Sequence, residues 1–131
     1  MTTLYDEVGG EATFRRLIDL FYGAVENDPV LRPLYLDEDL GPGGAARDRL
    51  ALFLMQYWGG PTTYSDTRGH PRLRMRHSPW QIGSRERDAW LSHMMAAVAA
   101  LDIPDGARER LADYLQAAAH SLVNAPDEPA R

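Results

Sequence analysis

The chain of 131 residues carries 14 basic and 19 acidic side chains, a formal net charge of −5, and it contains no cysteine. This length suits one domain, which can bury enough apolar surface to fold without covalent cross-links. The acidic balance argues against nucleic acid or an anionic membrane as the main partner. The lack of cysteine excludes disulfides, cysteine-bound metals, thiol catalysis and a thioether-linked cofactor. No stretch reaches the roughly 18 apolar residues of a membrane span, and no secretory signal is visible, so we expect a cytoplasmic protein.

Helical spacing dominates the first third of the chain, and no segment reads as a strand. A short turn at Leu4–Val8 ends at two glycines. The next helix begins at Glu11 and ends before Pro29, because proline disfavours helix in the residue that precedes it. Its apolar residues recur at intervals of three and four on one stripe: Phe14, Leu17, Ile18, Phe21, Tyr22 and Val25. One further helical turn is expected at Val30–Tyr35, before a glycine-rich loop.

A second long helix is predicted from Ala45 to about Trp58, where Gly59-Gly60-Pro61 ends it. Its expected buried face carries Ala46, Leu50, Phe53, Leu54 and Tyr57. Residues 62–69 read as an irregular loop. A proline at its first position can then begin a short helix over residues 71–77.

Two more long helices complete the pattern. The third is expected from an N-cap at Ser84 through Leu101, and the last carries apolar residues from Leu111 to Val123. The chain therefore predicts an all-α protein, a sandwich or bundle. We expect a single domain over residues 1–125 and a frayed tail over residues 126–131.

The four histidines show no metal-chelating spacing with carboxylates, and the HExxH, GxSxG, P-loop and GxGxxG signatures are absent. His77 is the most informative, because Leu73 lies one helical turn before it and Ile82 can close over the same side. A neutral imidazole in apolar surroundings suits an axial ligand of heme iron. On spacing alone, a core or surface histidine bonded to a backbone carbonyl is the simpler interpretation.

Basic side chains crowd the segment around this histidine: Arg68, Arg72, Arg74 and Arg76. In an acidic protein such a cluster indicates an anionic partner, and the two propionates of a heme would serve. The alternative is a solvated helix face balanced by Asp66, Glu86 and Asp88. A nucleic-acid site is less favoured, because the cluster is small and the rest of the chain is acidic.

Aromatic side chains with a polar tip are the last candidates: Tyr22, Tyr35, Tyr57, Tyr64 and Trp90. A buried phenol or indole normally finds a hydrogen-bond partner. These residues either pack in the core with a backbone partner or converge on one cavity and donate to a small polar ligand.

Two central runs carry a family resemblance. The first run is Tyr57-Trp58-Gly59-Gly60-Pro61, which contains a glycine break. The second run is the segment from His70 to His77. Together they resemble the group II truncated hemoglobins, the bacterial two-over-two globins. The resemblance extends from Tyr5 to Asn124 and includes the run Glu86-Arg87-Asp88-Ala89-Trp90-Leu91. It implies a two-over-two α-helical sandwich that holds heme b without a covalent bond.

By position, the resemblance makes His77 the proximal ligand of the heme iron. Tyr22 matches the distal tyrosine, and Trp90 matches the tryptophan whose indole faces the bound gas. Tyr35 matches an aromatic position that packs on the heme and can place a hydroxyl near the ligand. Ala46 stands where many hemoglobins have a distal histidine, and its small size leaves ligand stabilisation to these three donors. The loop at residues 41–44 looks longer than in the family, so Ala46 is aligned from the match that follows it.

The same resemblance gives the walls of the heme site. Leu50 and Phe53 would line the distal side, Leu73 and Ile82 the proximal side, and Arg49 and Arg76 would pair with the propionates. The implied ligands are O2, CO, NO and similar molecules at ferrous iron. Tight hydrogen bonding favours bound oxygen, whose partly anionic character it stabilises, and slow release argues against bulk oxygen transport.

Three rival functions stay open. A redox enzyme of the nitric oxide dioxygenase or peroxidase type would need a separate reductase, because the chain has no flavin or nicotinamide signature. A gas sensor would act through a partner, because no output domain is present. A cofactor-free helical interaction module is the third. The sequence leaves the oligomeric state open.

Overall fold

The computed structural model describes residues 3–35, 41, 44–69 and 82–123. This part of the chain is helical and contains no strand. Its elements in chain order are α1 (Leu4–Glu7), α2 (Glu11–Val25), the 3-10 helix η1 (Arg32–Tyr35), α3 (Ala45–Tyr57), α4 (Thr63–Arg68), α6 (Ser84–Ala99) and α7 (Asp105–Ser121).

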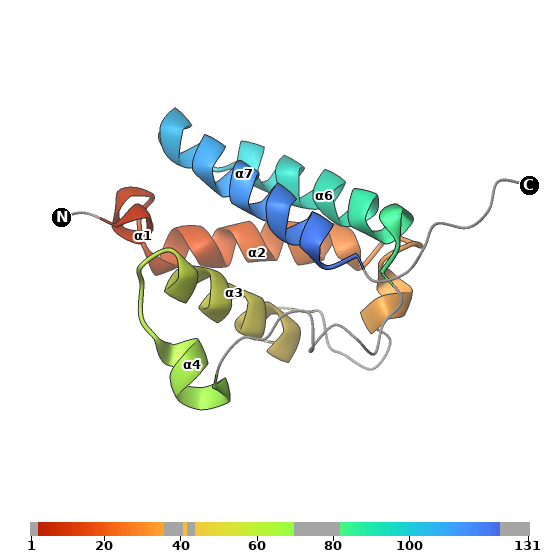
Figure 1. Ribbon diagram of the computed structural model, residues 1–131, viewed down its shortest axis with the longest axis horizontal. Helices are drawn as coiled ribbons and strands as arrows, with labels where there is room; N and C mark the ends of the chain where they lie inside the picture. Colours follow the sequence, from red (N-terminus) through yellow and green to blue (C-terminus); the bar gives the residue numbers. More distant parts are fainter. Residues whose placement is uncertain (1–2, 36–40, 42–43, 70–81, 124–131) are drawn as a thin grey trace, which may run out of the picture.

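The four long helices form two pairs (Figure 1). Helix α2 packs against α3, α6 packs against α7, and α2 also packs against α6, which joins the pairs. The short connection over residues 100–104 makes α6 and α7 antiparallel neighbours. The side chains that are most fully buried come from all four long helices and the turn before η1: Phe14, Phe21, Leu17, Ile18, Leu31, Leu54, Met94, Leu111, Leu115, Val25 and Val98.

The glycine break after α3 brings the chain against α1. The Tyr5 amide donates to the Trp58 carbonyl at 3.0 Å. A Cβ on Gly60 would lie 2.7 Å from the Tyr5 ring and 2.8 Å from the Met55 carbonyl oxygen, so only glycine fits there. The break therefore ends α3 and also fixes the first helix on its end.

Three local predictions were wrong. Residues 62–69 hold the short helix α4, where Gln56 bonds the backbone N–H and the hydroxyl of Ser65, and Tyr64 is buried. Helix α6 takes its N-cap at Gly83, one residue before the expected Ser84. Tyr57 is 53% exposed, because at the last residue of α3 its ring lies on α7 instead of entering the core.

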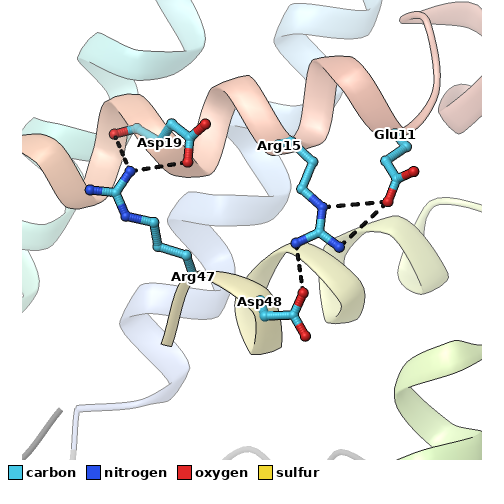
Figure 2. A network of polar contacts seen from close by, with 5 residues as sticks. All are labelled: Glu11, Arg15, Asp19, Arg47 and Asp48. Carbon is cyan, nitrogen blue, oxygen red and sulfur yellow. Dashed lines mark hydrogen bonds and ion pairs between the residues drawn. The ribbon is translucent and has the colours of Figure 1, made fainter. Parts of the chain in front are cut away.

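Two arginine networks hold α3 on α2 (Figure 2). Arg47 is buried, with 8% exposure, and donates to the Asp19 carboxylate at 3.0 Å. It also donates to the Glu26 carboxylate at 3.3 Å, a contact outside the view of Figure 2. On the more exposed side, Arg15 bonds Asp48 at 2.8 Å and Glu11 at 3.4 Å. Because burying an unpaired guanidinium is costly, the Arg47 pairs specify how α3 sits on α2. This matters for function, since α3 forms one wall of the cavity described next.

Candidate heme site

A cavity of about 410 Å³ lies between the two helix pairs. Its volume is in the range of small-molecule and cofactor sites. The wall is mainly apolar and aromatic, with four charged side chains: Tyr22, Leu31, Leu34, Tyr35, Ala46, Arg49, Leu50, Phe53, Leu54, Tyr64, Arg68, Ile82, Glu86, Arg87, Trp90, Tyr114, Leu115, Ala118, Ala119 and Leu122.

The three expected hydrogen-bond donors meet at this cavity from three different elements. Tyr22 comes from α2, Tyr35 from η1 and Trp90 from α6, and all three line the wall. The rings of Tyr22 and Tyr35 are in edge contact, with centroids 5.8 Å apart. The Phe21 ring packs against the Tyr22 ring at 5.0 Å and against the Trp90 ring at 5.4 Å, so it connects Tyr22 with Trp90.

Helix α3 supplies its expected side of the wall. Ala46, Leu50 and Phe53 all line the cavity, and so does Arg49. Ala46 is buried with 2% exposure, and its small side chain takes up little of the cavity that it lines with the three aromatic residues. Ala46 and Leu50 therefore lie on the cavity side of α3.

The charges of the cavity wall are three arginines and one glutamate. Arg49, Arg68 and Arg87 come from α3, α4 and α6, and Glu86 precedes Arg87. The Arg87 guanidinium is shared, with Nε on the Asp88 carboxylate at 3.0 Å and Nη1 facing His120 Nδ1 at 3.3 Å. The excess of positive charge suits an anionic group at the cavity.

Part of the expected site lies outside the described residues. His77, Leu73 and Arg76 belong to residues 70–81, as do His70, Arg72 and Arg74. Ile82, at the end of this segment, lines the cavity as expected. The segment that would carry the proximal ligand therefore joins the described chain at the cavity wall. Within the described part, no group of three or more His, Asp or Glu residues could hold a metal ion.

The corner between α2 and η1, which carries part of the wall, is held by hydrogen bonds to the Asp28 carboxylate. The Asp28 carboxylate contacts His93 Nε2 of α6 and also accepts from the backbone N–H groups of Val30 and Leu31. The His93 hydrogen bond, followed by these backbone bonds, lowers the pKa of Asp28. Asp28 therefore fixes Leu31 at the cavity, one turn before Tyr35.

Comparisons with known proteins agree on one family. A sequence model of the bacterial-like globins matches residues 3–124. A group 2 truncated hemoglobin of Bacillus subtilis is 37% identical over 118 residues, which cover 90% of this chain and 86% of that protein. The chain belongs to the group II truncated hemoglobins, within the bacterial-like globin family.

Solved structures show the same fold. A thermostable hemoglobin from the actinobacterium Thermobifida fusca gives a TM-score of 0.90 at 59% identity, over 96% of this chain and 100% of that one. The group II truncated hemoglobin of Bacillus anthracis gives 0.89 at 36% identity, over 98% and 95% of the two chains. The expected two-over-two fold is therefore confirmed. The protein is a globin of the kind that binds heme and small gaseous ligands such as O2.

The cavity of this truncated hemoglobin fits a heme in its chemistry. An apolar and aromatic wall suits the porphyrin ring, and the three arginines suit its two carboxylates.

The described part of the chain has no helix long and apolar enough to cross a membrane.

Two polar residues of the wall, Tyr114 and Arg87, were not singled out as site residues from the sequence, and Tyr64 was left between core packing and ligand binding. Helical spacing could have found the first two. Tyr114 falls three residues after Leu111 and four before Ala118 on the buried stripe of α7, and Arg87 precedes Trp90 by three residues on α6.

Burial and the neighbouring Tyr57 phenol raise the pKa of Tyr114 to about 12.

Proposed function

We propose that this globin holds heme b non-covalently in the cavity and binds O2 tightly there, through hydrogen bonds from Tyr22, Tyr35 and Trp90. Other diatomic ligands, CO and NO among them, would occupy the same place. The proposal covers one domain over residues 1–125 that works in the cytoplasm. That the protein binds heme and gases follows from its family.

One observation carries the proposal. Three side chains that can donate a hydrogen bond come from α2, η1 and α6 and line one cavity, within a single set of ring contacts. Aromatic residues that served only to stabilise their own helix would have no reason to share one wall.

Each residue then has a defined task. Heme, when bound, supplies the iron that binds the gas. His77 would be its protein ligand, with Leu73 and Ile82 beside it, and Leu50 and Phe53 would cover the other face. Arg49 and Arg76 would pair with the propionates, and Arg68 and Arg87 line the same cavity. The apolar wall excludes water, which strengthens every hydrogen bond inside.

Tight oxygen binding leaves two functions in view. Redox chemistry on a gas would require a separate reductase to return the iron to the ferrous state, and reduction of a peroxide would require an electron donor. Gas sensing would require a partner protein to carry the signal. The hydrogen-bond donors suit both, because each benefits from a ligand that is held and polarised.

The absorption spectrum tests the proposed function. Purified protein is measured as isolated, after dithionite, and after dithionite with CO, and the pyridine hemochrome then identifies the type of heme. We expect an intense Soret band that shifts with CO, and the hemochrome of heme b. A protein that retains no heme after reconstitution with hemin, or a spectrum that CO leaves unchanged, would contradict the proposal.

A further inference from the structure

Two stacked tyrosines connect the cavity with the surface. Tyr114 on α7 lines the cavity wall. Its ring lies 4.0 Å from the ring of Tyr57, with the planes tilted by 30°. Tyr57, at the end of α3, is 53% exposed. An aromatic side chain that reaches the heme cavity is therefore in ring contact with one that reaches the solvent.

We propose that Tyr57 and Tyr114 form an electron-transfer path by which small phenolic reductants at the surface reduce hydrogen peroxide in the cavity. The path rests on the proposed function, because the heme would be the group that reacts with peroxide. It adds a second substrate class, soluble phenols, and places their reaction at Tyr57 instead of in the cavity.

The neighbouring rings do not offer an equal route. Phe53 contacts Tyr57 at 6.4 Å, but a phenyl ring is much harder to oxidise than a phenol. Trp58 lies 5.4 Å from Tyr114, yet its indole N–H is buried and has no hydrogen-bond partner among the described residues. An indole that loses an electron there has no acceptor for its proton. The Arg110 guanidinium, 5.9 Å from the Trp58 ring, further disfavours positive charge on it.

The tyrosine pair can handle the proton. Tyr114 is protonated at neutral pH, as a tyrosine with the ordinary pKa of about 10 would be, and burial together with Tyr57 raises its pKa further, to about 12. Its oxidation is therefore coupled to loss of the hydroxyl proton. Tyr57 is exposed, so its hydroxyl proton can pass to water or be replaced from an external phenol. The oxidised state is therefore favoured at the outer residue of the pair.

The reaction balances with these components. Two phenol molecules each lose one electron and one proton as the O–H bond breaks, and they become phenoxyl radicals. Hydrogen peroxide takes up both electrons and both protons as its O–O bond breaks, and two water molecules form. Tyr57 passes through the phenoxyl form and regains its hydrogen atom from the external phenol.

Radical trapping locates the path directly. The hemin-loaded protein is treated with hydrogen peroxide and a nitroso spin trap without added phenol, then digested and mapped by mass spectrometry. We expect the trap on Tyr57 in the wild type. Tyr57→Phe should lose this adduct, and Tyr114→Phe should strongly reduce it at Tyr57. Tyr5→Phe is the matched control, because Tyr5 stacks on Phe14 and not on this pair, and it should keep the adduct.

Turnover of an added phenol, 2-methoxyphenol, gives the second readout. Both path variants should oxidise it more slowly than the wild type and Tyr5→Phe do. Tyr57→Phe, whose ring does not line the cavity, should keep the wild-type rate of the spectral change with peroxide alone. An adduct on other residues in the wild type, or undiminished phenol oxidation in both variants, would overturn the path and leave the proposed function intact. A protein that fails to retain heme would remove the proposed function and the path together.

Discussion

The phenol rings of Tyr22 and Tyr35 meet edge to face at the cavity, with centroids 5.8 Å apart and planes at 87°. Tyr22 belongs to the long helix α2 and Tyr35 to the single 3-10 turn η1, so their contact fixes the turn against the helix. Phe21 continues the contact to Trp90. A change in one ring therefore affects the position of the next, and we expect the effects of substitutions here to be coupled.

The first prediction concerns the iron ligand. If His77 is the only protein ligand, His77→Ala should weaken heme retention and abolish the normal ferrous–CO spectrum. His70→Ala is the control from the same segment and should keep both. The absorption spectrum of each variant, loaded with hemin and reduced under CO, is the measurement. A wild-type spectrum for His77→Ala together with an altered one for His70→Ala would reverse the assignment.

The second prediction concerns the propionate partners. Arg49 lines the cavity and Arg76 lies outside the described residues. Neutralising either one should speed the transfer of hemin to an acceptor protein, and more so at low salt, where charges are less screened. Arg16→Ala is the control, because Arg16 is exposed on α2 and does not line the cavity. Transfer rates equal to that of the control would assign Arg49 and Arg76 to the solvated surface.

The third prediction concerns the buried Arg47. Its side chain is 9% exposed and bonds two carboxylates, so Arg47→Ala removes charge-assisted hydrogen bonds and leaves a gap between α2 and α3. We expect a loss of about 2 kcal/mol in the free energy of unfolding. Arg15→Ala, in the exposed network beside it, should lose less than about 1 kcal/mol. Urea unfolding measures both, and equal losses would contradict the structural role given to Arg47.

The fourth prediction concerns acid stability. The pKa of Asp28 is lower in the folded chain than the unfolded value of 3.8, because His93 and two backbone N–H groups favour the carboxylate. Its contribution to stability is therefore present above that value and is lost as the pH falls through the folded pKa. Asp28→Asn should make the free energy of unfolding less sensitive to pH below about pH 4.

Asp102→Asn is the matched control for Asp28, because it removes an exposed carboxylate from the turn between α6 and α7. Urea unfolding of the wild type and both variants at neutral and acid pH is the comparison. If Asp28→Asn destabilises the protein equally at both pH values, the contact with His93 does not carry the pH dependence.

The long helices could be predicted from sequence because each has a clear period and a clear stop. Glu11–Val25 carries an apolar stripe and ends before Pro29, and it appears with the expected bounds. Helix α4 was missed because Thr63–Arg68 has one apolar anchor, Tyr64, and depends on bonds from Gln56 on another helix. Such tertiary contacts leave no periodic signal in a short segment.

The residues of the cavity wall were predicted mainly from the resemblance to the group II truncated hemoglobins, and less from helical spacing. Helical spacing placed Tyr22 on a buried stripe. Spacing alone could not predict that Tyr22, Tyr35 and Trp90 line the same cavity. Tyr57 was expected in the core, since helical spacing cannot tell a buried terminal residue from one whose ring leans on a neighbouring helix. Tyr114 lay on the α7 stripe and was overlooked, although it links the cavity to that ring.

The central claim is that three converging side chains hold bound oxygen by hydrogen bonds. Each bond to a polarised ligand is worth roughly 1.5–3 kcal/mol, or between tenfold and somewhat over a hundredfold in an equilibrium constant. Trp90→Phe should have the larger effect, because an indole N–H can only donate, whereas a tyrosine hydroxyl can turn toward a neighbour. Tyr22→Phe should have a smaller effect alone, and the double variant should be non-additive.

Stopped-flow measurement of O2 release from Trp90→Phe, Tyr22→Phe and the double variant is the most direct test of this claim, with CO release as the internal control. We expect a substantial rise in the O2 release rate and a smaller change for CO, which carries less charge when bound. Unchanged O2 release in all three variants would contradict it and would return these residues to core packing.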